Sequence, residues 1–137
     1  MPRTLASFFI LILIFPWTES FAADPATGPV VEDYGPVLPV AAGAFNLESD
    51  RHYKVSKDVS ASDDDYRKLN RGFESVARLL NMQARSGTPM SQFDMAVVVH
   101  GMAAKDLLTD AAYQSRFGMS NPNTDLLAAL EKAGVAI

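Results

Sequence analysis

A histidine and a glycine that directly follow an apolar run are the residues best placed to do chemistry. The run ends at His100 and Gly101, and open α/β sheets bind ligands at the carboxyl ends of their strands. Histidine titrates near neutral pH, and glycine lets a ligand approach the backbone. The N–H groups of residues 102–105 would open a helix, whose start favours an anion. We therefore predict that His100, Gly101 and Met102 bind a small anion, either a sulfur oxyanion or a phosphate.

Three further side chains are candidates for the same site, each with a structural alternative. Lys105 could pair with the anion or stay solvated on a helix surface. Asn81 lies within an amphipathic stretch and could point into the sheet crevice or towards the surface. Asn121 could bind the ligand, although asparagine before a proline is typical of a helix cap. His100 could also bond a backbone carbonyl, with Gly101 serving only the turn.

The residues that several other chemistries require are missing. The chain has no cysteine, so it has no disulfide, thiolate metal site or cysteine nucleophile. His52 and His100 lack a partner at metal-site spacing, and the acidic run 63–65 suits a helix start better than a metal. No glycine-rich phosphate loop or nucleophile elbow is present. We predict no metal, no cofactor and no catalytic residue, since acid–base chemistry at His100 has no visible carboxylate partner.

The elements that would position this site alternate between strands and helices. Residues 52–60 alternate in polarity, which predicts a strand whose apolar side is interrupted by Lys57. A capping-box-like start at Ser62 and an apolar stripe predict a long helix that ends near Gly87. Residues 94–100 lack alternation, which predicts a strand covered on both faces by helices.

The rest of the chain continues the same alternation. Helices are predicted over residues 103–108, 110–117 and, with Asn121 as the cap, 122–133. Residues 135–137 are typical of the opening of another strand. This order predicts right-handed crossovers and a doubly wound parallel sheet, hence an α/β fold.

The N-terminal residues predict targeting and a linker. Residues 1–22 combine a basic start, an apolar stretch too short to span a bilayer and small residues at a cleavage site, which predicts a signal peptide. Residues 23–50 are rich in proline and glycine and predict an extended linker; the alternative is that apolar residues in it dock on the domain, namely Val37, Leu38 and Phe45. The folded domain is expected over 51–137. We expect a secreted, periplasmic protein without a membrane contact after cleavage.

The charge of the chain narrows its partners. The net charge is −4, and no basic cluster is present. Such a protein is a poor candidate for binding nucleic acid. Small molecules or proteins are the expected partners.

Several short motifs resemble the DsrE/DsrF-like family of small sulfur-relay domains. They are Val-Val-Val-His-Gly at 97–101, Lys-Asp-Leu-Leu at 105–108, Arg-Phe-Gly at 116–118, Asn-Pro-Asn at 121–123 and Ala-Gly-Val at 133–135. The resemblance extends from about Tyr53 to Ile137. It implies a flavodoxin-like three-layer sandwich, a homo-oligomer or a complex with sulfur-metabolism proteins, and, in active members, persulfide transfer on a cysteine.

The resemblance also implies a segment that this sequence does not contain. Exported relatives continue from Ala-Gly-Val through a strand into a cysteine loop, often Cys-Gly-Gln. We therefore expect C-terminal strands that are missing or incomplete, and a non-catalytic module that binds an anion or a protein. The alternative is a fragment of a persulfide sulfurtransferase whose cysteine-bearing C-terminus is absent. Lys57 also departs from the more apolar residue usual at its position.

Overall fold

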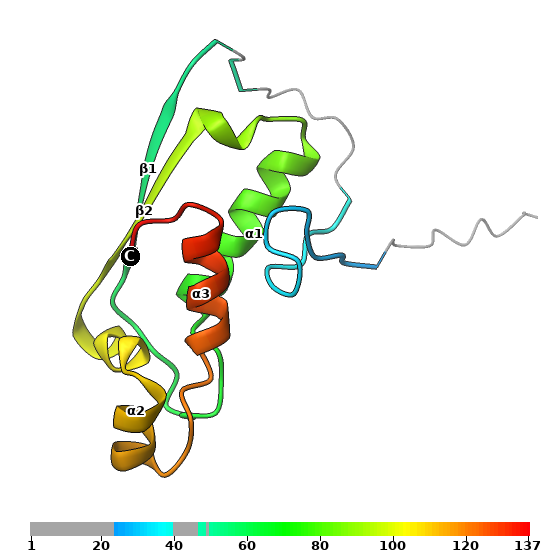
Figure 1. The fold of residues 1–137 in the computed structure, drawn as a ribbon. Coiled ribbons are helices and arrows are strands. Elements are labelled where there is room, and N and C mark those ends of the chain that lie inside the picture. Colours follow the sequence, from blue (N-terminus) through cyan, green and yellow to red (C-terminus); the bar gives the residue numbers. More distant parts are fainter. Residues whose placement is uncertain (1–23, 40–46, 49) are drawn as a thin grey trace, which may run out of the picture.

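The computed structural model describes residues 24–39, 47–48 and 50–137. The predicted signal peptide (1–22) and Phe45 lie outside these residues. The elements follow one another as β1 (Tyr53–Val59), α1 (Arg71–Arg85), the 3₁₀ helix η1 (Met90–Gln92), β2 (Phe93–Val99), the 3₁₀ helix η2 (Gly101–Leu107), α2 (Asp110–Phe117) and α3 (Thr124–Lys132) (Figure 1). Within the described ranges, no helix has the length and apolar character needed to cross a membrane.

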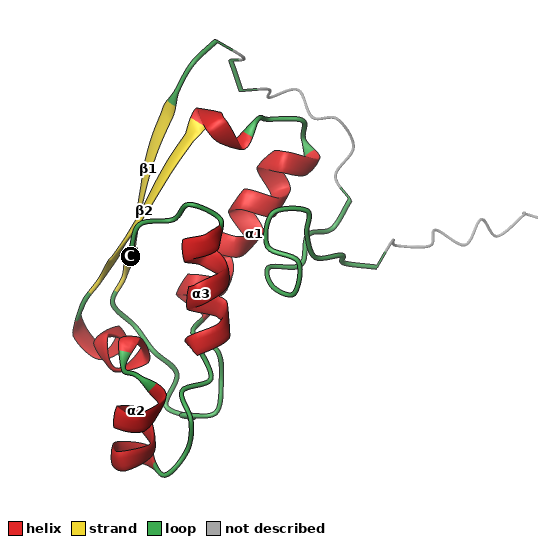
Figure 2. Cartoon of the chain, viewed as in Figure 1, coloured by secondary structure: helices red, strands yellow, loops and turns green. Residues whose placement is uncertain are grey.

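The two strands form a small parallel sheet, which confirms the α/β class and both predicted strands (Figure 2). β1 and β2 pair in register along their whole length. On the other side of β2, Val97 N donates to Ala136 O at 2.7 Å and Ala136 N donates to Met95 O at 3.0 Å. Ala136 thus lies parallel to β2, as expected for the segment predicted to open a further strand.

Helices cover only one face of this sheet in the described part of the chain, so the prediction of a strand buried on both faces is wrong. α1 and α3 lie on the same side of the strands (Figure 1), and they share one apolar core with the sheet, made by Val59, Phe73, Val76, Leu80, Met95, Val97, Leu126 and Leu130. On the opposite face, Val98 is 54% exposed. α2 lies beyond the ends of the strands (Figure 1). The described residues therefore form two layers, and a flavodoxin-like three-layer sandwich is not confirmed.

α1 begins later than predicted. Residues 62–69 form turns and irregular backbone instead of helix. Asp65 N donates to Asp63 Oδ1 at 2.9 Å, a local side-chain bond that competes with helix formation. The helix cap is Asn70, whose Oδ1 accepts from Gly72 N at 2.7 Å. The predicted end is confirmed, because α1 stops at Arg85 and is followed by Gly87 with φ of 87°.

The later helices match the prediction in part. α2 lies where it was expected. The segment from residue 101 to 107 is a 3₁₀ helix instead of an α-helix. α3 begins at Thr124, two residues after the predicted start, because Asn121 Oδ1 accepts from Asn123 N at 2.9 Å and holds a turn there.

Residues 24–39, here called the N-terminal segment, pack against α1 and are not a free linker. Val31 and Val37 are buried, which favours the docking alternative for Val37, whereas Leu38 is 57% exposed. Gly35 has φ of 64°, and a Cβ there would lie 2.2 Å from the backbone nitrogen of Arg78. Only glycine allows the chain to approach α1 so closely. The N-terminal segment therefore belongs to the same folded unit as α1.

Candidate functional site

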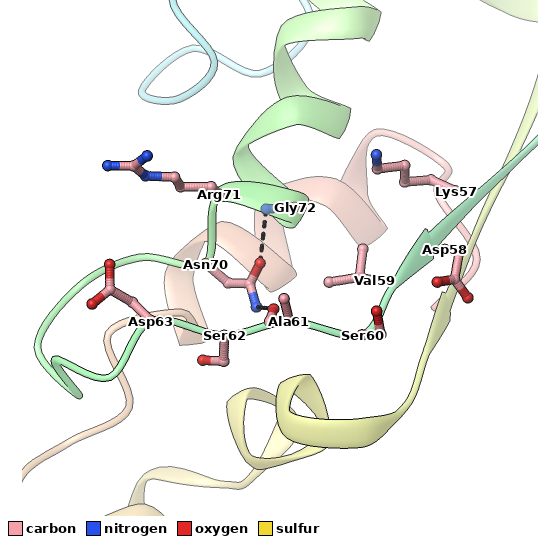
Figure 3. Close-up of a pocket in the computed structure, with 10 residues that line it drawn as sticks. All are labelled: Lys57, Asp58, Val59, Ser60, Ala61, Ser62, Asp63, Asn70, Arg71 and Gly72. Carbon is pink, nitrogen blue, oxygen red and sulfur yellow. Dashed lines mark hydrogen bonds between the residues drawn. The ribbon is translucent and has the colours of Figure 1, made fainter.

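A crevice of about 450 Å³ opens at the carboxyl end of β1 (Figure 3). It is lined by strand residues 57–59, loop residues 60–63 and residues 70–72 at the start of α1. This is the end of a parallel sheet at which α/β proteins bind ligands, and the volume is typical of a small-molecule site.

Two cationic residues are among those that line the crevice, and the Arg71 side chain extends away from Lys57 (Figure 3). Lys57 comes from β1 and Arg71 from the first turn of α1 (Figure 3). Both are exposed, and in the part of the chain that the structure describes neither has a hydrogen bond or an ion pair. Lys57 alternates with Val55 and Val59 on the helix-facing side of β1, which explains the interruption of the apolar pattern. The sequence showed this interruption, but its role was missed.

The two carboxylates of the crevice each have their own partner. Asp58 Oδ1 lies 2.8 Å from His100 Nε2. Asp63 Oδ2 lies 3.4 Å from Lys68 Nζ. The hydrogen bond from Asp65 N lowers the pKa of Asp63 against the opposing effect of burial, and the charge of Lys68 adds to the lowering. These contacts leave Lys57 and Arg71 as the crevice charges that have no partner in the described residues.

Lys105 lies behind the crevice wall instead of in the crevice. Its Nζ donates to Ser62 Oγ at 2.6 Å and to Asp106 Oδ1 at 2.7 Å, and its side chain is 14% exposed. The rings of Tyr66 and Tyr113 lie 5.2 and 5.9 Å from the ammonium group. Burial acts to lower the pKa of Lys105, but the hydrogen bond and charge of Asp106 outweigh it and raise the pKa. The charge of Lys105 is therefore already paired within the protein, and its pairing with a bound anion stays a prediction.

This arrangement orients the hydroxyl group of Ser62. Its Oγ accepts the hydrogen bond from Lys105, and Ser62 also lines the crevice. A hydroxyl that accepts from an ammonium group still has its own O–H to donate. Ser62 can therefore donate to an acceptor that enters the crevice.

Hydrogen bonds among buried polar side chains hold together the segments at the base of the crevice. Asp106 is 1% exposed, and its Oδ2 accepts from Asn70 Nδ2 at 2.7 Å. Asn70 N donates to Asn123 Oδ1 at 2.7 Å. Asn121 Nδ2 donates to the backbone oxygens of Asp106 and Leu108. Asn121 therefore joins η2 to the turn before α3, and its amide is used in structure instead of in ligand binding.

The contacts of His100, Gly101 and Met102 differ from those that the sequence indicated. Asp58 supplies the carboxylate partner that sequence reasoning did not find for His100, so one acceptor site of this histidine's partner is already used. Gly101 has φ of 58°, and a Cβ would lie 3.1 Å from Ser60 O, so this glycine serves the turn. Ala103 N donates to that same Ser60 oxygen. Met102 is exposed, and the N–H of Ala103 is already used by Ser60, a residue of the crevice wall.

Asn81 lies near the other end of α1 and does not join the crevice. It is fully buried, and its Oδ1 accepts from Val30 N at 3.1 Å and Val31 N at 2.9 Å. Its Nδ2 donates to three backbone oxygens, those of Val31, Tyr34 and Gly35. Both ends of the amide are thus used to hold the N-terminal segment, and ligand binding by Asn81 stays a prediction.

The fold and the crevice define a small α/β protein with a polar site at the carboxyl end of its sheet. The chain matches no protein-family model, no curated protein and no solved structure.

Proposed function

We propose that this protein is a non-catalytic module that binds a small anion, a sulfur oxyanion or a phosphate, in the crevice. The observation that carries the proposal is the pair of cations without partners among the described residues, Lys57 and Arg71, in the lining of a crevice at the carboxyl end of β1. The guanidinium group of arginine matches two oxygens of an oxyanion, and lysine adds a point charge.

Two further features of the crevice favour an anion. The hydroxyl of Ser62 is oriented by Lys105 and can donate to an oxygen. The crevice also lies at the start of α1, a helix of 15 residues, where the helix dipole is positive. The ligand would meet these cations and donors beside the carboxylates of Asp58 and Asp63, which already have partners of their own.

The arrangement favours binding over covalent chemistry. A serine beside a lysine can act as a nucleophile when the lysine is neutral and accepts the proton of the hydroxyl. Here Asp106 raises the pKa of Lys105, so the ammonium form persists at neutral pH. Ser62 is therefore a hydrogen-bond donor to the ligand and not an activated nucleophile.

Calorimetric titration at low ionic strength with thiosulfate, sulfate and phosphate tests this function. Lys57→Met and Arg71→Gln should each weaken binding about tenfold, the effect of losing roughly 1.4 kcal/mol of interaction. Lys132→Met, at the exposed end of α3, is the matched control and should bind as the wild type does. A wild type that binds none of the three anions, or a Lys57→Met protein of unchanged affinity, would contradict the proposal.

A relation to the DsrE-like sulfur-relay proteins is the second candidate. It is favoured by the parallel pairing of Ala136 with Ala96, which sets the residues after Ala-Gly-Val beside β2, where the resemblance implies a strand. Sequencing of the coding region downstream of the Ile137 codon tests it. An in-frame strand and Cys-Gly loop would support a fragment of a persulfide sulfurtransferase, whereas a stop codon would leave the anion-binding module.

Export to the periplasm belongs to the same proposal. The charge and apolar pattern of residues 1–22 support it, because they have the order of a signal peptide. Amino-terminal sequencing of the protein from the periplasmic fraction should begin at Ala23. A chain recovered only from the cytoplasm with its first 22 residues intact would contradict export.

A further inference from the structure

β1 has a strand partner on one side only. In the described ranges it pairs with β2 and with no other strand. Val59 O accepts from His100 N at 3.1 Å, so the odd-numbered residues of β1 direct their backbone polar groups at β2. Strand geometry then directs the N–H and C=O groups of Lys54, Ser56 and Asp58 away from the sheet. Such an edge is a template for another strand.

We propose that two copies of this chain pair through β1, antiparallel and centred on Ser56. A twofold axis brings the same strand of each copy together. In this register Lys54 of one copy lies opposite Asp58 of the other copy, on the same face of the sheet, and the symmetry repeats the pair. Opposite charges in directly facing positions stabilise an antiparallel pair.

The charges and the length of β1 favour this register over its neighbours. Centring on Ser56 pairs all seven residues of the strand. Centring on Lys57 would set the two copies of that lysine opposite each other. Centring on Val55 would set Lys54 opposite Ser56 and lose the ion pair. The Ser56 register is thus the one in which the charges on the outer face of β1 are complementary.

The side chains that would form the ion pair are accessible. Lys54 is exposed and has no hydrogen bond or ion pair with any described residue. Asp58 is 64% exposed and uses Oδ1 for His100, so its Oδ2 can accept from an incoming lysine. The pairing does not require the crevice to hold an anion.

Zero-length carbodiimide cross-linking with sedimentation velocity tests the register. Within one copy, Lys54 and Asp58 are four residues apart on an extended strand, about 13 Å, which is too far for a zero-length bond. The wild type should form a dimer as concentration rises, and the dimer band should contain a peptide that joins Lys54 to Asp58. A monomer at all concentrations, or a dimer without this peptide, would overturn the proposal.

Variants of β1 separate the contribution of its side chains to dimerisation from the contribution of its backbone. Lys54→Asp and Asp58→Lys should each weaken dimerisation at least tenfold, because like charges then face each other, and the double variant should recover it. Ser56→Pro removes an outward N–H at an edge position that tolerates proline, so it should be monomeric with an unchanged circular dichroism spectrum. Ser56→Ala is its control and should dimerise normally. A dimer that persists in both Lys54→Asp and Ser56→Pro would refute pairing through β1.

Discussion

The two ends of α1 use polar side chains in opposite ways. Near the carboxyl end, Asn81 is fully buried, and its amide contacts backbone groups of the N-terminal segment. At the amino end, Arg71 of α1 and the nearby Lys57 of β1 are exposed at the crevice and have no partner among the described residues. A buried side chain with every bond made indicates a structural role, whereas the exposed cations at the crevice are the residues on which the proposed anion binding depends.

The largest effect should come from removing the carboxylate beneath the crevice. Asp106→Ala would remove the carboxylate that pairs with the largely buried Lys105 ammonium group and that accepts one of the two hydrogen bonds of Asn70 Nδ2. We expect the free energy of unfolding to fall by about 3–5 kcal/mol, the usual cost of breaking a buried ion pair. Urea denaturation at pH 7 measures it. Asp64→Ala, an exposed residue of the neighbouring loop, should change little; equal losses in the two variants would contradict the assignment.

Removal of the Asn81 amide, near the carboxyl end of α1, should cause the second largest loss of stability. Asn81→Ala would leave backbone groups of the N-terminal segment without partners, at a cost of about 2–3 kcal/mol. Urea denaturation, with partly exposed Met82→Ala as control, gives the loss. Limited proteolysis should cut residues 24–39 faster in the variant. An N-terminal segment that stays protected would show that other contacts hold it.

Alkaline pH should weaken the amino-terminal end of α1 selectively. The pKa of Lys105 is raised in the folded state by Asp106 despite burial, so its stabilisation is complete below the unfolded value of about 10.5 and is lost as pH rises through the folded value. Burial also raises the pKa of Tyr113, which acts in the same direction. Urea midpoints measured from pH 8 to pH 12 should fall at the alkaline end. Tyr113→Phe should keep the part of this fall that is due to Lys105. A urea midpoint that does not change with pH in the wild type would disprove the link between Lys105 and stability.

The smallest effect should be the change in stability on removing a crevice cation. Lys57→Met and Arg71→Gln should alter the free energy of unfolding by less than about 0.5 kcal/mol, as is usual for exposed residues. Thermal melts without ligand measure this change. Added phosphate should then raise the melting temperature of the wild type more than that of either variant. A large loss of stability without ligand would make these residues structural and remove the contrast between the two ends of α1.

Local patterns in the sequence predicted which helices and strands form more accurately than they predicted where these elements begin and end. Both strands and the end of α1 follow from alternation, an apolar run and Gly87. The start of α1 was missed because the turn at Asp63 competes with helix formation. β2 was expected to be covered on both faces because its run is apolar throughout, yet Val98 is exposed.

The site was harder to predict because its contacts depend on tertiary register. Asp58 meets His100 because the parallel pairing sets Asp58 beside Val98, and this spacing is invisible before the strands are aligned. Lys57 was visible as an anomaly on the apolar side of β1, and that anomaly was the signal that could have located the crevice. The partners of Asn81 are backbone groups, which leave no trace in residue type.

The attachment of the N-terminal segment has a consequence for the order of folding. The hydrogen bond from Val31 N to Asn81 joins residues 50 positions apart, and closing so long a loop costs more chain entropy than forming local contacts does. The receiving surface on α1 exists only after that helix has formed and packed on the sheet. We therefore expect α1 and the strands to assemble first and the N-terminal segment to dock last, as a slow late phase in refolding.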